Sequence, residues 1–298
     1  MVPAPARGLS WLTALRLARV SNLPTVWTNV LAGVVLAGGE AWSTGTLLLI
    51  LALSLLYSAG MYLNDAFDHE IDAAERPGRP IPSGAAALNT VFFLGFALLL
   101  GGLVVLVPTG YLFAETTGWR PVLSGLALAA AILFYDWHHK RNPLSPVFMA
   151  LCRLLAYLTA GYAVTATPPA ALYLGAVAGF AHIVGLTYAA RQENLAEVGN
   201  LWPLAVLAVP LGYGLWLASG GIVALLLWLA LAACVGFAVH RLRRRSPGDV
   251  PQAVVTLIAA TALLDGVLVS GAGRPELGAL AGAAFALTLL LQRWVRGT

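Results

Sequence analysis

Charged residues are scarce in this chain. Asp, Glu, Lys and Arg make up only 10% of the 298 residues, whereas 59% are hydrophobic and the mean hydropathy is +0.82. A soluble domain carries roughly a quarter of its residues as charges, so a surface built for water is excluded. Lysine is almost missing, since Lys140 is the only lysine among the 17 basic residues. This composition predicts an integral membrane protein.

Cysteine and several catalytic motifs are also rare or missing. Cys152 and Cys234 both lie in apolar stretches, which excludes a disulfide framework and a paired-cysteine metal site. The sequence has no glycine-rich nucleotide loop and no nucleophilic serine motif. Basic and aromatic residues do not alternate, so no nucleic-acid partner is expected. The N-terminus lacks a short apolar core with a small-residue cleavage site, and we expect no signal peptide to be removed.

Long apolar runs fill most of the chain. By the criterion of roughly 20 residues per span they number about ten. They predict an all-α, polytopic membrane bundle of about nine to ten transmembrane helices, forming one domain over residues 1–298. The runs are 16–38, 44–63, 90–107, 121–135, 147–165, 171–190, 200–218, 221–239, 251–271 and 276–292.

Basic residues divide unequally between the two sides of a ten-span bundle. One side receives fourteen of the 17, the other receives Arg120 and Arg274, and Arg153 falls inside a span. Because positive loops stay inside, the richer side is predicted to be cytoplasmic, with the chain crossing the inner (plasma) membrane many times. The fourteen are Arg7, Arg16, Arg19, Arg76, Arg79, Lys140, Arg141, Arg191, Arg241, Arg243, Arg244, Arg245, Arg293 and Arg296.

Five of the thirteen acidic residues fall within eleven positions after the second apolar run: Asp65, Asp68, Glu70, Asp72 and Glu75. Such clustering is costly unless a cation neutralises it, although an ordinary solvated helix end is the alternative. If the helix continues, Asn64, Asp68 and Asp72 share one face at spacings of four residues. Oxygen ligands beside water and phosphate favour Mg²⁺, so this face is a candidate magnesium site.

The stretch that follows the acids contains three prolines and two arginines. Residues 76–84 read Arg-Pro-Gly-Arg-Pro-Ile-Pro-Ser-Gly, and the prolines deny this stretch a helix and stiffen it. Arg76 and Arg79 can bind phosphate oxygens in a bidentate manner. Next to a metal site, the loop is typical of one half of a diphosphate clamp.

The order Asn64-Asp65-x-x-Asp68-x-x-x-Asp72, followed by Arg76-Pro77-x-Arg79-Pro80-Ile81-Pro82-Ser83-Gly84, closely resembles the first signature of the UbiA-type membrane prenyltransferases. In that family the aspartate-rich motif binds Mg²⁺ and the diphosphate of an isoprenoid donor. The resemblance therefore implies Mg²⁺ as cofactor, an isoprenyl diphosphate as donor and a lipophilic, aromatic acceptor as second substrate. It also implies a central cavity that opens to the cytoplasmic side. Asn64, Asp65, Asp68 and Asp72 would be metal ligands, with Asp68 and Asp72 also catalytic.

Two further segments resemble the family. Arg19 and Asn22 open the first span, where the family carries a basic and a polar residue that face the cavity. The segment Tyr135-Asp136-Trp137-His138-His139-Lys140-Arg141 resembles the family's aromatic-plus-lysine loop. The resemblance implies that Arg19, Asn22, Arg79, Lys140 and Arg141 bind diphosphate, that Lys140 is catalytic and that Tyr135 lines the cavity. A simple membrane anchor is the alternative for the Lys140 loop.

The family's second aspartate motif is not matched. After the sixth span the chain reads Tyr188-Ala-Ala-Arg191-Gln-Glu193-Asn-Leu-Ala-Glu197. Two interpretations stay open: Glu193 and Glu197 coordinate a second Mg²⁺, or Arg191 replaces that metal as a diphosphate ligand. In a third interpretation the site binds no second metal. Tyr188 is a candidate for the cavity or the acceptor.

Arg153 and Asp265 are charged residues deep inside predicted spans, and such residues are functional by default. Two roles are open for Arg153: pairing with an acid, or orienting an acceptor. For Asp265 we expect a hydrogen bond to a neighbouring helix, or a place nearer the interface than the span boundaries indicate.

The combined prediction is an intramembrane prenyltransferase that ionises an isoprenyl diphosphate and transfers the prenyl group. A membrane terpene cyclase, in which the donor's own double bond captures the cation, is the main alternative. A transporter or lipid-binding bundle is a less favoured one, because Asp265 alone sits deep in a span. The acceptor, the prenyl chain length and the oligomeric state are not specified by these residues.

Overall fold

The computed structural model describes residues 9–140, 142–192 and 200–295, and within these ranges it contains helices and no strand. Seven helices are long and apolar enough to cross a membrane, and three shorter apolar helices complete the set. Together they correspond to the ten predicted runs, so the all-α multi-pass bundle is confirmed. The elements are α1 (Trp11–Leu17), η1 (Val20–Asn22), α2 (Leu23–Leu36), α3 (Thr44–Phe67), α4 (His69–Glu75), α5 (Leu88–Leu106), η2 (Val107–Tyr111), α6 (Arg120–His138), α7 (Ser145–Val164), α8 (Ala170–Arg191), η4 (Trp202–Leu207), α9 (Ala208–Ala218), α10 (Ile222–Arg244), α11 (Asp249–Gly271) and α12 (Pro275–Leu291).

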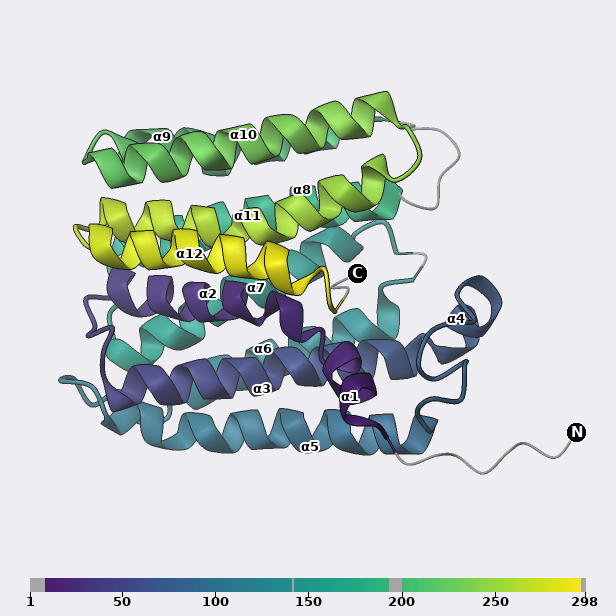
Figure 1. Cartoon of the computed structure of the whole chain (residues 1–298). Coiled ribbons are helices and arrows are strands. Elements are labelled where there is room, and N and C mark those ends of the chain that lie inside the picture. Colours follow the sequence, from purple (N-terminus) through teal and green to yellow (C-terminus); the bar gives the residue numbers. More distant parts are fainter. Residues whose placement is uncertain (1–8, 141, 193–199, 296–298) are drawn as a thin grey trace, which may run out of the picture.

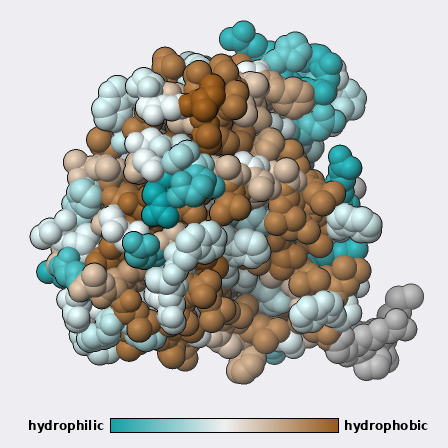
Figure 2. All heavy atoms as spheres, turned by 60° about the vertical axis from the view of Figure 1, so that its left-hand side comes forward, coloured by the Kyte–Doolittle hydropathy of each residue, from teal (hydrophilic) through white to brown (hydrophobic). Residues whose placement is uncertain are grey.

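The apolar helices run nearly alongside one another, from α9 and α10 at one flank to α5 at the other (Figure 1). Helix α11 is central, because it packs against α2, α8, α9, α10 and α12. Its apolar window is 83% buried, against 22% for α10 at the flank. Figure 2 shows hydrophobic side chains over much of the visible surface, with hydrophilic patches between them. Such a surface suits contact with lipid along the flanks.

Most of the charged connections gather at one end of the bundle. Helix α4, the α6–α7 connection and the α10–α11 connection all lie at the right-hand end in Figure 1. There the buried Asp249 carboxylate accepts hydrogen bonds from Arg241 and Arg244 at 2.7 Å, which closes the α10–α11 hairpin. Two of the basic residues on the predicted cytoplasmic side, Arg241 and Arg244, therefore fix α10 to α11.

The contact between α2 and α7 depends on Gly33. A Cβ at this position would lie 2.7 Å from the Ala160 Cβ and 2.9 Å from the Tyr157 carbonyl oxygen, and that backbone atom cannot turn away. We expect Gly33→Ala to lower the free energy of unfolding by about 1–3 kcal/mol, because the two helices must separate. Thermal unfolding of the detergent-solubilised protein measures the effect.

The matched control for Gly33→Ala is Gly236→Ala. Gly236 lies within α10, and a Cβ there meets no described atom within 4 Å. Since alanine favours a helix over glycine by about 1 kcal/mol, this change should leave the melting temperature unchanged or raise it. Equal melting temperatures for the two variants would show that the α2–α7 contact is not tight.

Candidate active site

A cavity of about 520 Å³ lies between α2, α3, α6, α7, α8 and α11. Its size falls within the range of small-molecule sites. One part of its wall is polar and reaches the end of the bundle that carries α4; these residues are Arg19, Asn22, Asn64, Asp68, Arg76, Arg79, His139, Lys140 and Arg191. The remaining wall is mainly apolar, and includes Val26, Leu53, Leu128, Ile132, Ile183 and Ile258. The cavity can therefore hold a molecule with an ionic head and a hydrocarbon tail.

Asp68 is the carboxylate at the polar end of this cavity. Its Oδ2 lies 3.2 Å from the Lys140 Nζ and 3.3 Å from the His139 Nε2, and only 4% of the residue is exposed. Burial raises the pKa of Asp68, but His139 and Lys140 outweigh burial and hold this pKa below its ordinary value. Asp68 is thus an ionised carboxylate at neutral pH, paired with two groups from the end of α6.

The other two aspartates of the motif face arginines. Arg79 Nη1 donates to Asp65 Oδ1 at 3.1 Å and to Asp72 Oδ2 at 2.9 Å, and Arg19 Nη2 donates to Asp65 Oδ1 at 3.3 Å. Burial, followed by the charges of Asp68 and Asp65, raises the pKa of Asp72 despite the attraction of Arg79. Asp65 and Asp72 do not lie among the residues that line the cavity. The proline-rich loop therefore folds back onto the acids and supplies their counter-charge.

The helix that carries the motif is not continuous. α3 ends at Phe67, Asp68 lies in a turn, and α4 begins at His69 in a new direction (Figure 1). Backbone hydrogen bonds at helical spacing still join Asp68 to Asn64 and Asp72 to Asp68, at 3.0 and 2.8 Å. Because of this bend the three side chains have different surroundings: Asn64 and Asp68 line the cavity, whereas Asp72 pairs with Arg79.

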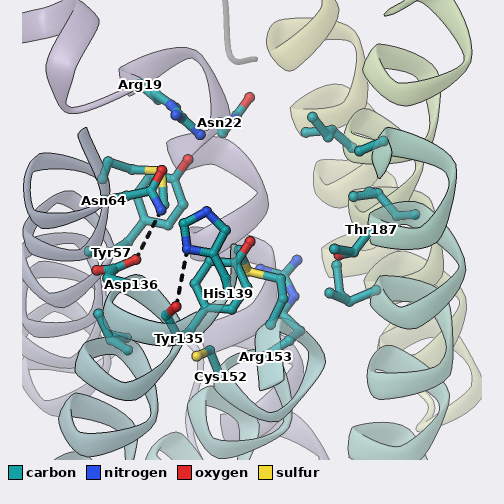
Figure 3. A pocket seen from close by; sticks show the side chains of 18 of the residues that line it. Arg19, Asn22, Tyr57, Asn64, Tyr135, Asp136, His139, Cys152, Arg153 and Thr187 are labelled. Atoms are coloured by element: carbon teal, nitrogen blue, oxygen red, sulfur yellow. Dashed lines mark hydrogen bonds between the residues drawn. The ribbon is translucent and has the colours of Figure 1, made fainter. Parts of the chain in front are cut away.

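The side-chain oxygen atoms at the polar end of the cavity fit a magnesium ion. The Asn64 Nδ2 donates to Asp136 Oδ1 at 3.2 Å (Figure 3), which leaves the Asn64 amide oxygen for another partner. Asp136 Oδ2 is buried and has no hydrogen-bond partner among the described residues. Three oxygen-bearing side chains, Asn64, Asp68 and Asp136, therefore line one part of the cavity, and hard oxygen donors are the ligands that Mg²⁺ prefers. Within the described ranges no group of three or more His, Cys, Asp or Glu residues is arranged to hold a metal by itself, so an ion here needs the amide and the substrate as well.

Some of the remaining predicted site residues line the cavity and others do not. Arg19, Asn22, Tyr135 and Lys140 line the cavity. Arg191 also does, and its Nη1 donates to the carbonyls of Asn142 and Pro143 at 3.1 and 3.0 Å, so it holds the α6–α7 connection. Tyr188 lies outside the lining and donates to the Asn200 carbonyl at 2.6 Å. Arg141, Glu193 and Glu197 lie outside the described residues.

Arg153 and Asp265 meet in the middle of the bundle. Arg153 Nη2 lies 3.6 Å from Asp265 Oδ2 and donates to the Thr25 carbonyl at 2.9 Å, while Arg153 also lines the cavity. Asp265 is fully buried and accepts hydrogen bonds from Thr28 on α2, at 2.6 Å, and from Tyr157 on α7. The expected hydrogen bond to a neighbouring helix is confirmed, and Arg153 has an acid partner.

Two residues at this site were not predicted as functional. Asp136 and His139 come from the end of α6, and both line the cavity (Figure 3). A signal was present, because an aspartate at the end of an apolar run is costly without a partner. What the sequence lacks is the partner's identity, since Asn64 is 72 positions away.

Comparison with known proteins identifies relatives. The family model described as UbiA prenyltransferase family matches residues 25–258. The digeranylgeranylglyceryl phosphate synthase of Methanopyrus kandleri is 29% identical over 67% of this chain and 69% of its own length. That of Sulfolobus acidocaldarius is 28% identical over 50% of each, so the chain spans about half the length of that relative. The chloroplastic chlorophyll synthase of Avena sativa is 31% identical over 42% of this chain and 34% of its own length.

Solved structures show the same fold. A UbiA homologue from Aeropyrum pernix K1 superposes with a TM-score of 0.62 at 17% identity, covering 85% of this chain and 97% of that chain. A structure described for digeranylgeranylglyceryl phosphate synthase in membranes gives a TM-score of 0.61 at 18% identity, covering 87% and 97%. At such low identity these likenesses concern the arrangement of helices alone.

Proposed function

The chain belongs to the UbiA prenyltransferase family, and from this premise we propose that it is an intramembrane, Mg²⁺-dependent prenyltransferase. It takes an isoprenyl diphosphate as donor and transfers the prenyl group to a lipophilic, aromatic acceptor. The relatives named as digeranylgeranylglyceryl phosphate synthase and chlorophyll synthase support prenyl transfer as the reaction class. The proposed place is the inner (plasma) membrane, with the charged end of the bundle facing the cytoplasm.

One observation carries the proposal. A single cavity joins an ionic end, built around Asp68 and Lys140, to an apolar wall formed by α2, α6, α8 and α11. A diphosphate needs cationic donors, whereas an isoprenoid tail needs a dry hydrocarbon surface. A transport path would place several acids along the middle of the bundle, whereas the acid found there in the described part of the chain, Asp265, is held by Thr28, Tyr157 and Arg153.

The basic residues assist departure of the diphosphate. When the bond between donor C1 and its oxygen breaks, the electron pair leaves with the diphosphate and its negative charge grows. Lys140, Arg19 and Arg79 stand at this end of the cavity to neutralise that charge. In this structure Arg79 pairs with the carboxylates of Asp65 and Asp72. When Arg79 binds the diphosphate, it exchanges these carboxylates for phosphate oxygens. Mg²⁺, held by Asn64 and Asp68 with Asp136 nearby, would supply further electrostatic stabilisation of the diphosphate oxygens.

The rest of the cavity protects the allylic cation. Its apolar side chains exclude water, and the rings of Tyr57 and Tyr135 line it, where aromatic faces stabilise a cation. The acceptor then gives an electron pair to C1, and the proton that it loses passes to the departed diphosphate. Bond breaking and bond formation both occur at donor C1, so the acceptor must reach C1 where the ionic end meets the apolar wall.

Product analysis tests the proposal. The purified full chain is supplied with Mg²⁺ and C10 to C20 allylic diphosphates, with and without a hydroquinone acceptor, and the organic extract is analysed by mass spectrometry. We expect a product whose mass equals that of the acceptor plus the prenyl group minus one hydrogen, formed only with the acceptor. A cyclic hydrocarbon formed from donor alone would replace transfer by cyclisation, and a donor that stays intact with every acceptor would contradict both reactions.

A further inference from the structure

A second polar region lies inside the cavity, away from its ionic end. Arg153 comes from α7, eight positions after the helix begins at Ser145, or about 12 Å along its axis. Thr187 stands on α8 on the other side of the cavity in Figure 3, and Arg153 points toward the space between them. Asn29 lies on α2, two turns beyond Asn22, and also lines the cavity. Three helices, α2, α7 and α8, therefore each bring a polar side chain to the wall of the cavity.

These side chains carry polar groups with no partner in the described part of the chain. They are both amide atoms of Asn29, the hydroxyl of Thr187 and the Nε of Arg153. Asn29 is 1% exposed and Thr187 8%, so water does not satisfy them freely. Buried groups of this kind are normally hydrogen-bonded, and each exception calls for a reason. The terminal amide torsion of Asn29 is soft, and a threonine hydroxyl rotates easily, so both can turn toward a bound molecule.

The charge of Arg153 limits what can bind here. Asp265 lies 3.6 Å from the guanidinium and is itself fully buried, so the pair is already neutral as a unit. An anionic ligand would add an unbalanced charge in a region of low dielectric, which is unfavourable. A neutral oxygen group that both donates and accepts hydrogen bonds matches Asn29, Thr187 and the free N–H of Arg153. A hydroxyl group has this property.

We propose that Asn29, Arg153 and Thr187 form a subsite for the hydroxyl-bearing head of the prenyl acceptor. This inference rests on the proposed function and adds to it the chemical class of the acceptor. The donor cannot fill this subsite, because its diphosphate belongs at the cationic end near Lys140 and its tail is pure hydrocarbon. Asp265 acts as a positioning residue for Arg153, and Thr28 and Tyr157 fix Asp265 by donating hydrogen bonds to its carboxylate.

Binding of three probes of equal tail length tests the subsite without turnover. The full chain in detergent is titrated with 4-heptylphenol, heptylbenzene and 4-heptylbenzoate, and protein-free micelles correct for partitioning. We expect the phenol to bind at least about tenfold more tightly than heptylbenzene, because a site with unpaired polar groups rejects the analogue that lacks the hydroxyl. The benzoate should bind more weakly than the phenol.

Two variants and a matched control assign this selectivity to the subsite. Thr187→Val and Asn29→Leu should each lower the phenol-to-heptylbenzene ratio by about threefold or more, with little change in heptylbenzene affinity. Thr288→Val makes the same isosteric change on α12, where the buried hydroxyl donates to the Ala284 carbonyl and does not line the cavity. This control should retain the wild-type ratio, since each ratio compares two probes in the same protein.

Three results would overturn the subsite. They are equal binding of phenol and heptylbenzene by the wild type, an unchanged ratio in both Thr187→Val and Asn29→Leu, or a benzoate that binds more tightly than the phenol. Failure of the proposed function is separate, because it is measured as the missing prenylated product. Tighter binding of the phenol without a prenylated product would support the subsite and contradict the transferase. A prenylated product with equal binding of phenol and heptylbenzene would support the transferase and contradict the subsite.

Discussion

Replacing Asp68 by alanine should lower the rate of diphosphate release by at least about 100-fold, the size of effect seen when one preorganised electrostatic group is removed from an active site. Of the acidic run in the described chain, Asp68 alone contributes a carboxylate to the cavity wall. His139 and Lys140 keep its pKa below the ordinary value, so it is charged and available to a metal at neutral pH. Pyrophosphate release from an isoprenyl diphosphate, at saturating Mg²⁺ and acceptor, measures the loss.

Glu70→Ala is the matched control for Asp68→Ala. Glu70 belongs to the same acidic run, but its side chain is 87% exposed and does not line the cavity. Its rate should stay within about twofold of the wild type, because exposed charges interact weakly across solvent. If Asp68→Ala keeps more than a tenth of the activity, the role assigned to Asp68 is wrong. If both variants lose activity equally, the acidic run acts through its total charge and the position of Asp68 is not decisive.

Replacing Asp265 by leucine should give the largest loss of stability, about 3–5 kcal/mol, which is typical when one partner of a buried ion pair is removed. The change leaves Arg153 with a buried charge and no acid, and it also removes the acceptor used by Thr28 on α2 and Tyr157 on α7. Three helices, α2, α7 and α11, are joined at this carboxylate, so its loss weakens the packing between all three. Reversible unfolding in mixed micelles measures the change.

The double variant Asp265→Leu/Arg153→Met is the control for this loss. Because it removes both charges together, it should recover most of the stability lost by Asp265→Leu alone. A single variant within about 1 kcal/mol of the wild type would mean that the pair contributes little, in line with a hydrated surface pair. A double variant as unstable as the single one would assign the loss to the hydrogen bonds of Thr28 and Tyr157.

The helices were predictable from the sequence because a bilayer leaves so few choices. A span must satisfy its backbone internally, so apolar runs of sufficient length become helices. Even the three short spans were found, and the gap between the predicted runs 251–271 and 276–292 matches the connection between α11 and α12. The arginine-rich side was likewise visible in the sequence, although its orientation toward the cytoplasm stays a prediction.

The site was predictable in its components and less so in its contacts. The motif predicted Asn64, Asp65, Asp68 and Asp72 as metal ligands, and of these the structure places Asn64 and Asp68 in the cavity wall. The sequence could not reveal that Arg79 would bridge Asp65 and Asp72, because this depends on how a proline-rich loop folds back. Nor could it pair Arg153 with Asp265, which lies on α11, four helices later in the chain order. Such contacts depend on how the helices pack, and the spacing of residues in the sequence does not predict that packing. The metal-binding and diphosphate-binding roles of all these residues stay predictions.

The most direct test is a cryo-electron microscopy map of the full chain with Mg²⁺ and the unreactive analogue geranylgeranyl thiodiphosphate. The proposed function predicts diphosphate oxygens within hydrogen-bonding distance of Lys140 and Arg79, metal density touching Asn64 or Asp68, and the tail along the apolar wall of the cavity near Ile132. A diphosphate bound elsewhere, for example at the arginines that close the α10–α11 hairpin, with the cavity empty of ligand, would contradict it.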